Sequence, residues 1–185
     1  MSEGKLNKFE NPVRLAELDP EGTLRAAGFS DGMSLCDIGA GTGVFSIPAA
    51  RISRGKIYAL EASDAMIALL ENRRREQGID NLEILKVTSR ELPLEDGLCD
   101  MAVMVTVLHE IDDKKAMLDE AGRILKADGK LLVIEFHKWA TPMGPPAEHR
   151  ISKEEVKEIC ISSRCRVIEE SIMGENFYKI IFSPR

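Results

Sequence analysis

The sequence predicts an α/β fold, a three-layer sandwich in which helices cover a mostly parallel seven-stranded sheet with an antiparallel edge strand. From residue 33 onward, short apolar runs alternate with amphipathic stretches of helical spacing. The run from Met101 to Val105 is wholly apolar, as expected of a parallel strand that helices cover on both faces. Residues 166–171 and 177–182 are separated by too few residues for a helical crossover, which indicates an antiparallel hairpin.

Start and stop signals place the individual elements. Asp19 is a candidate N-cap and Pro20 suits the first helical position, so a short N-terminal helix is expected before Gly28. Ser152 and Glu155 have the spacing of a capping box, which predicts a helix from residue 153 to about residue 162. Periodicity and glycine stops predict the others, in order strand 34–38, a helix between Gly43 and Gly55, strand 56–60, a helix between Ser63 and Gly78, strand 82–87, strand 100–106, helix 113–126 and strand 130–134.

Length and composition limit the classes of function. A chain of 185 residues is long enough for one well-buried domain. It has no apolar run of the roughly 18 residues that a membrane span needs, and residues 1–8 lack a signal-peptide core, so we expect a cytoplasmic protein. The formal net charge of −6 gives no general attraction for a polyanion, which makes nucleic acid an unlikely partner.

The four cysteines give no sign of a metal site or a disulfide framework. Cys36, Cys99, Cys160 and Cys165 show no C-x-x-C spacing and have no nearby histidine partners. We therefore expect thiols and no metal.

The most informative segment is residues 35–43, an apolar run that enters a glycine-rich turn with the pattern G-x-G-x-G from Gly39 to Gly43. Glu61 ends the next apolar stretch, where a carboxylate can accept hydrogen bonds from a ribose diol. A phosphate-binding P-loop needs lysine after its last glycine, and a dinucleotide-binding turn needs glycine at position 44. Val44 disfavours both.

This arrangement resembles motif I and the acidic ribose-binding position of class I S-adenosylmethionine-dependent methyltransferases. Residues 90–100 and 107–111 are similar to the segments that precede and follow the fourth strand in that family, and the resemblance covers roughly residues 30–183. The loop at 136–150 resembles that of the small-molecule methyltransferases of ubiquinone and menaquinone biosynthesis. The resemblance implies a Rossmann-like fold, S-adenosylmethionine as methyl donor and S-adenosylhomocysteine as product.

The resemblance also implies cofactor-binding residues. Glu61 would accept both ribose hydroxyls, Asp37 would either contact the ammonium group or order the turn, and Met66 would pack on adenine or in the core. Thr88 or Ser89 stands where the family usually has an aspartate, so we expect altered affinity at the adenine end rather than lost binding. The full set is Asp37, Gly39, Ala40, Gly41, Gly43, Glu61, Ala62, Met66, Thr88, Ser89, Arg90 and Thr106.

Candidate catalytic residues follow the fourth and fifth strands. Ligands of open α/β sheets bind beyond the carboxyl ends of the strands, which selects residues 106–110 and 135–139. His109 is the first candidate for a general base, with shaping of the cofactor wall as the alternative. Glu135 and His137 are second candidates for acid–base roles.

The segment 136–150 is long for a connection and is stiffened by three prolines. We expect either a substrate wall or lid, or an ordered surface excursion. Its apolar residues favour a planar or apolar acceptor, whereas its basic residues favour a carboxylate; the two sets are Phe136, Trp139 and Met143, and Lys138, His149 and Arg150.

The sequence thus predicts a single domain, 1–185, that transfers a methyl group in line to a small-molecule acceptor. Within it we expect an N-terminal helical segment at 1–30, a cofactor-binding half at 31–135, and a lid with a closing helix and hairpin at 136–185. The alternatives are a nicotinamide-dependent oxidoreductase, a non-catalytic cofactor-binding module that activates a partner, and arsenite methylation through cysteines. The acceptor, and the choice between monomer and homodimer, stay open.

Overall fold

The computed structural model describes residues 9–163 and 165–184. The helices are α2 (Pro12–Leu18), α3 (Pro20–Ala26), α4 (Ser46–Ile52), α5 (Asp64–Glu76), α6 (Lys114–Ile124) and α7 (Lys153–Ser162), with 3-10 turns η1 (Leu108–Glu110) and η2 (Ala147–His149). The strands are β1 (Leu35–Ile38), β2 (Ile57–Glu61), β3 (Leu82–Lys86), β4 (Cys99–Val105), β5 (Leu125–Phe136), β6 (Cys165–Met173) and β7 (Phe177–Pro184).

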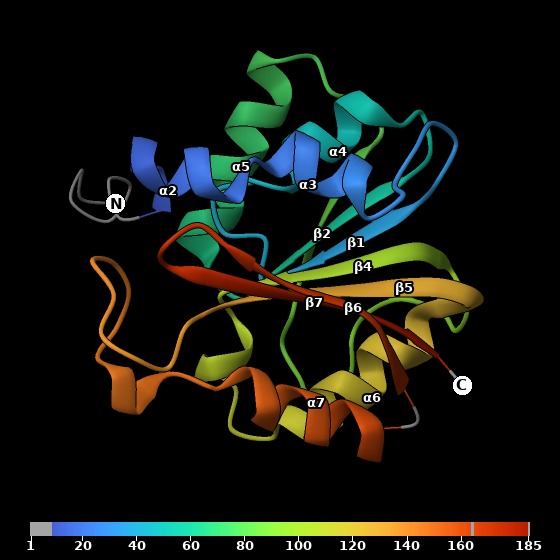
Figure 1. The fold of residues 1–185 in the computed structure, drawn as a ribbon. Helices are drawn as coiled ribbons and strands as arrows, with labels where there is room; N and C mark the ends of the chain where they lie inside the picture. Colours follow the sequence, from blue (N-terminus) through green and yellow to red (C-terminus); the bar gives the residue numbers. More distant parts are fainter. Residues whose placement is uncertain (1–8, 164, 185) are drawn as a thin grey trace.

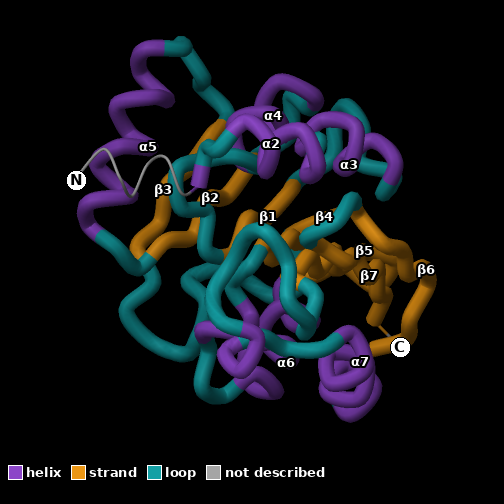
Figure 2. Tube along the Cα trace, turned by 60° about the vertical axis from the view of Figure 1, so that its left-hand side comes forward, coloured by secondary structure: helices purple, strands orange, loops and turns teal. Residues whose placement is uncertain are grey.

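The strands form one seven-stranded sheet in the order β3-β2-β1-β4-β5-β7-β6. Figure 1 and Figure 2 show α2, α3, α4 and α5 on one face of this sheet and α6 and α7 on the other. The predicted three-layer α/β sandwich is confirmed, with β4 at the centre of the sheet. The chain order reverses between β1 and β4, and open α/β sheets bind ligands at such a point.

Alternation along the central strand explains its wholly apolar sequence. Met101 and Val103 of β4 join the core on the α4 side, whereas Ala102 and Met104 join the core on the α6 side. All four are buried, because both faces of the sheet are covered. Neither face can therefore carry a polar side chain here, and the polar residues gather at the strand ends.

The C-terminal half of the sheet differs from expectation in two details. The antiparallel strand is β7, which pairs with β5 and β6 and lies one place inside the edge. The prediction that the fifth strand begins at residue 130 is wrong, because Leu125 already pairs with Cys99. A register shift between Cys99 and Met101 accommodates the extra residues of β5, so Gly129 lies within the strand.

The described part of the N-terminal segment holds two helices, α2 and α3, where the sequence predicts one. Asn11 caps α2 by accepting a hydrogen bond from the backbone N–H of Val13, and Pro12 follows at the first helical position. Asp19 then ends α2 and caps α3. The pattern of a capping Asn or Asp followed by proline thus occurs twice, at Asn11-Pro12 and at Asp19-Pro20, and the predicted helix rests on the second alone. Residues 1–8 of the predicted 1–30 segment lie outside the described residues.

A buried asparagine fixes α2 onto the β6–β7 hairpin. The Asn176 side-chain amide donates to both carboxylate oxygens of Glu17, at 2.9 and 3.0 Å. The Asn176 side-chain oxygen accepts from the backbone N–H of Met143, and its backbone oxygen accepts from that of His137. One residue therefore joins the N-terminal helix, the hairpin and the long segment after β5.

Arg150 holds the segment after β5 in place. Its guanidinium is buried and donates to the backbone oxygens of Pro145, His137, Trp139 and Met143, and also to the hydroxyl of Thr141. The guanidinium also lies 5.4 Å from the ring centroid of Phe136. These contacts engage Arg150 with the protein itself, although it also lines a cavity, so its use for an acceptor carboxylate stays a prediction.

We predict that Arg150→Met lowers the free energy of unfolding by about 2–4 kcal/mol, because one buried and three partly buried carbonyls lose a charged donor together. Arg54→Met is the matched control, since Arg54 pairs with Asp31 at an exposed surface and should change stability by less than about 0.5 kcal/mol. Urea unfolding measures both, and hydrogen exchange should rise across residues 137–147. Equal stability of the two variants would contradict the assigned role.

Candidate active site

The glycine turn lies at the carboxyl end of β1 and is hydrogen-bonded to the neighbouring strand, β2. The backbone N–H groups of Gly39 and Ala40 both donate to the carbonyl of Leu60 in β2, at 2.9 and 3.0 Å. Gly39, Gly41 and Gly43 all have positive φ, of 76°, 55° and 86°. The conformation that L-residues rarely adopt explains why glycine occurs three times in this turn.

The room for a Cβ differs among the three glycines, and it shows which of them packs against the protein and which faces open space. A Cβ on Gly39 would lie 2.5 Å from Val107, and one on Gly43 would lie 2.5 Å from Leu70, so the protein itself excludes larger residues there. A Cβ on Gly41 would meet no atom closer than 3.9 Å. Gly41 is therefore the glycine of the turn that leaves open space for a ligand.

Glu61 ends β2 beside that open space. One carboxylate oxygen accepts from the backbone N–H of Gly41 at 2.8 Å, and the other accepts from those of Ala62 and Ser63 at 2.8 Å. The side chain is thus held by the turn it faces, and it is only partly buried. Its position beside Gly41 agrees with the predicted ribose-binding role, which stays a prediction.

Asp37 is a buried carboxyl group at the entrance to the turn. It is 3% exposed and accepts a hydrogen bond from the hydroxyl of Ser46 in α4. Burial raises the pKa of Asp37 to about 6, against the opposing effect of Ser46. A carboxylate buried without a cation is unfavourable, so a ligand ammonium is a suitable partner for Asp37.

The residues predicted for the adenine end are less enclosed. Met66 is buried on α5, whereas Thr88, Ser89 and Arg90 are exposed after β3. The Ser89 hydroxyl donates to the backbone of Glu91, and Arg90 pairs with Asp113.

Thr106 follows β4 in a strained conformation. Its φ is 55°, unusual for a β-branched residue, and its N–H donates to the carbonyl of Ile134 at 2.7 Å. Its hydroxyl accepts from the Arg14 guanidinium at 2.8 Å. Backbone strain of this kind clusters at functional sites, and Thr106 lies between the glycine turn and the residues after β5.

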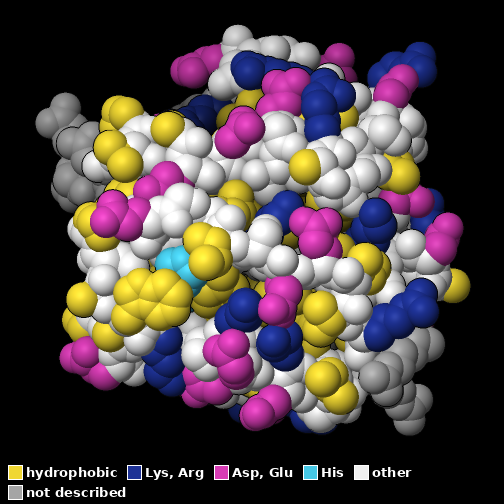
Figure 3. Space-filling view, viewed as in Figure 1, with side chains coloured by type: hydrophobic (Ala, Val, Ile, Leu, Met, Phe, Trp, Pro, Cys, Tyr) yellow, Lys and Arg dark blue, Asp and Glu magenta, His cyan; other side chains and the backbone are white. Residues whose placement is uncertain are grey.

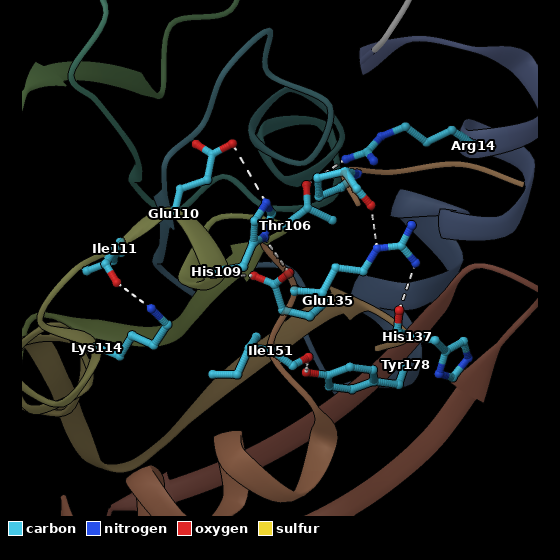
Figure 4. A network of polar contacts seen from close by, with 12 residues as sticks. Arg14, Thr106, His109, Glu110, Ile111, Lys114, Glu135, His137, Ile151 and Tyr178 are labelled. Atoms are coloured by element: carbon cyan, nitrogen blue, oxygen red, sulfur yellow. Dashed lines mark hydrogen bonds and ion pairs between the residues drawn. The ribbon is translucent and has the colours of Figure 1, made fainter. Parts of the chain in front are cut away.

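His109 and Glu135 form a buried hydrogen-bonded pair (Figure 4). Nδ1 of His109 lies 2.7 Å from one carboxylate oxygen of Glu135, and the backbone N–H of His109 donates to the other at 3.2 Å. Their side chains are 7% and 1% exposed. A proton on Nδ1 satisfies the carboxylate and leaves Nε2 as the basic nitrogen. The structure thus brings together two of the three predicted acid–base residues.

His137 lies apart from this pair in Figure 4. Its ring stacks on Trp139 with the centroids 3.9 Å apart, and burial lowers the pKa of His137, helped by Lys153 and Arg150. Figure 3 shows hydrophobic side chains around a histidine on the side of the molecule where the 137–150 segment lies. His137 lines neither of the two cavities that His109 borders, so the structure gives it a packing environment.

Two cavities meet at His109. The smaller, of about 260 Å³, is lined by Phe9, Asn11, Arg14, Thr106, His109, Glu110, Phe136, Met143, Gly144 and Pro145. The larger, of about 670 Å³, lies towards α7 and includes Lys114, Lys138, His149 and Glu155. His109, Glu110 and Pro145 line both. The segment after β5 therefore contributes to a cavity wall, as one of its two predicted roles required.

Arg14 is the site residue that sequence reasoning missed. It is 8% exposed, lines the smaller cavity and lies 5.5 and 5.3 Å from the ring centroids of Phe136 and Phe177. Recognising Asn11 as a helix cap would have placed Arg14 and Leu18 on one face of α2, where a charged residue shares a stripe with a buried leucine.

Comparison with known proteins agrees with this geometry. A family model described as a methyltransferase domain matches residues 29–182. The ubiquinone/menaquinone biosynthesis C-methyltransferase UbiE of Shewanella sp. (strain W3-18-1) is 29% identical over 119 residues, which are 63% of this chain and 47% of that protein. The chain thus spans about half the length of the curated relatives it matches.

Solved structures match over more of the chain. A SAM-dependent methyltransferase from Aquifex aeolicus matches with a TM-score of 0.91, 28% identity and 98% coverage of each chain. The [4+2]-cyclase SpnF matches in fold, with a TM-score of 0.81 at 17% identity over 92% of this chain and 82% of that one. The family model spans the glycine turn, Glu61 and the His109–Glu135 pair. The chain therefore belongs to the methyltransferase-domain family.

Proposed function

We propose that the protein transfers the methyl group of S-adenosylmethionine to a small-molecule acceptor bound in the cavity beside His109. The observation that carries this proposal is the His109–Glu135 pair, whose histidine lines a cavity at the same sheet edge as the glycine turn. The relatives of ubiquinone and menaquinone biosynthesis support a small-molecule acceptor.

The residues present fit the cofactor. The open position beside Gly41 admits a ligand, Glu61 offers carboxylate oxygens to a ribose, and the buried Asp37 offers a counter-charge to an ammonium group. When bound, S-adenosylmethionine supplies an electrophilic methyl group. We assign residues 31–135 to the cofactor-binding half and residues 136–185 to the acceptor side and closing elements, within one domain that also holds the helices of residues 9–30.

The protein's own contribution to the reaction is orientation and proton removal. Glu135 holds the His109 ring through Nδ1 and the backbone, so Nε2 keeps a fixed position at the cavity. Nε2 takes the proton that an acceptor oxygen, nitrogen or acidic carbon gives up as the methyl group replaces it. Buried Glu135 stabilises the imidazolium that results.

Fold alone does not establish this reaction, since a [4+2]-cyclase shares the fold. The nicotinamide-dependent oxidoreductase is disfavoured by the family match and by Val44 in the glycine turn. A non-catalytic module that activates a partner is the second candidate. Measuring methyl transfer decides between this module and a methyltransferase. No helix in the described part of the chain is long and apolar enough to cross a membrane. A cytoplasmic location stays a prediction.

We predict that S-adenosylhomocysteine binds in calorimetry and NAD does not. Glu61→Ala should weaken that binding at least tenfold, because charge-assisted hydrogen bonds to the ribose are lost. Asp64→Asn is the matched control: Asp64 lies near Glu61 but pairs with Lys86 at the surface, and binding should be unchanged. Binding of NAD in preference to S-adenosylhomocysteine would overturn the assignment.

We predict that affinity for S-adenosylhomocysteine rises about tenfold from pH 5 to pH 7. The pKa of Asp37 is raised from 3.8 to about 6. Below that value the free protein holds a proton that must leave before the carboxylate can pair with the ligand ammonium, and above it no further gain follows. Asp37→Asn should remove the pH dependence. Methylthioadenosine lacks the ammonium, so its affinity should stay constant, and a flat profile for both ligands would contradict the contact.

We predict that His109→Ala lowers transfer of labelled methyl groups to small molecules of a cell extract by about 10²–10⁴-fold, because the general base is removed. Glu135→Gln should cause a smaller loss and displace the acid limb of the pH–rate profile, since it changes the group that holds Nδ1. Binding of S-adenosylhomocysteine should be unchanged in both variants. Activity within twofold of the wild type in His109→Ala would assign His109 to the cavity wall only.

A further inference from the structure

We propose that the smaller cavity selects a planar acceptor of about one ring that carries a single negative charge, and that Arg14 binds this charge. The inference rests on the proposed function, because it assigns the acceptor to the cavity that His109 lines. It is carried by the surroundings of Arg14, by the apolar walls and by the cavity volume.

Arg14 is a buried cation that the described residues compensate only in part. Its guanidinium lies over the rings of Phe136 and Phe177 and donates one hydrogen bond, to the neutral hydroxyl of Thr106. Its Nε is buried and has no hydrogen-bond partner among the described residues. Among the described residues no carboxylate hydrogen-bonds the guanidinium, and the acidic effect on it is the coulombic one of Glu135. A buried charge in this condition is unfavourable unless a counter-charge arrives, and a ligand that lines the cavity with Arg14 can supply it.

The nearest acidic influence on Arg14 comes from a group that is already engaged. Glu135 raises the pKa of Arg14 against a larger opposing effect of burial. Both carboxylate oxygens of Glu135, however, accept hydrogen bonds from His109. Arginine stays protonated in such a setting. The cavity therefore keeps a cation that faces no dedicated partner.

The lining and the volume of the cavity indicate the polarity and the size of the rest of the ligand. Phe9, Phe136, Met143 and Pro145 are apolar, and the polar residues of the lining are Asn11, Arg14, Thr106, His109 and Glu110. The Glu110 side chain is 74% exposed, whereas Arg14 is buried. The volume of about 260 Å³ is below the range of about 300–1,000 Å³ that is typical of sites for drug-sized ligands. A cavity of this size, with apolar walls beside a buried cation and its one carboxylate turned to solvent, suits a single ring whose carboxylate or ionised hydroxyl lies at Arg14.

Contacts on both sides of α2 hold Arg14 in position. Glu17, one turn further along the helix, accepts from buried Asn176 in the β6–β7 turn. Glu10, before the helix, pairs with Arg73 of α5, which also donates to the carbonyl of Thr42 in the glycine turn. The guanidinium is therefore preorganised, and the same segment contacts the turn expected to hold the methyl donor.

The test compares benzoate with its neutral isostere benzamide by calorimetry, on the full chain with S-adenosylhomocysteine present. We expect wild-type protein to bind benzoate at least tenfold more tightly than benzamide, as a charge-assisted contact requires. Arg14→Gln should abolish this preference and Arg14→Lys should keep part of it. Arg25→Gln is the matched control, because Arg25 pairs with Glu21 on the exposed face of α3, and the preference should be unchanged.

A second readout does not depend on the variants. Benzoate should shift the methyl NMR signal of Met143, which lines the cavity, and not that of Met117 on α6. Benzoate that binds no better than benzamide, that keeps its preference in Arg14→Gln, or that leaves Met143 unaffected would overturn the inference. Failure of S-adenosylhomocysteine to bind would instead overturn the proposed function, and the two failures are measured separately.

Discussion

Parallel pairing of β1, β4 and β5 is the constraint on which the site depends. Ile38 pairs with Met104, and Val105 pairs with Ile134, so the three strands end at one edge of the sheet. Each strand continues into a segment of different character. A glycine turn follows β1, the strained Thr106 and then a histidine follow β4, and a carboxylate stands at the end of β5. Segments far apart in the chain meet there because the hydrogen bonds of the sheet fix their register.

The charged groups at this edge of the sheet are buried. Asp37 and Glu135 are both almost fully buried, and they differ in the partners that the protein gives them. The protein supplies Glu135 with a histidine, whereas it supplies Asp37 with the hydroxyl and backbone N–H of Ser46 and no cation, and burial raises the pKa of Asp37 to about 6. A buried group that the protein satisfies orients its neighbour, and one that it leaves unsatisfied is suited to a ligand. Arg14 belongs with Asp37 in this respect.

The sequence predicted what local pattern determines. Glycine spacing, the apolar central strand and the capping box of α7 each predicted an element that the structure contains. Prediction failed where distant contacts decide. Asn176 and Glu17 are 159 residues apart, and their contact places Arg14 in the cavity. Likewise, His109 and Glu135 were separate candidates, because sequence separation says nothing of the 2.7 Å between them. Leu125 joined β5 because a partner on β4 outweighed the turn preference of Gly129.

The anchoring of the segment after β5 has an evolutionary consequence. Four of the five groups that accept hydrogen bonds from Arg150 are backbone carbonyls, which every amino acid carries. The path of the segment therefore depends little on most side chains along it; Gly144, with a φ of 102° and no room for a Cβ, and Thr141, whose hydroxyl accepts from Arg150, are the exceptions. Residues such as Met143 that face the cavity can be exchanged while the wall keeps its shape. Relatives that keep this arginine could change the methyl acceptor they bind by substituting the side chains of the cavity wall. The backbone of the segment and the sheet beneath it would stay as they are.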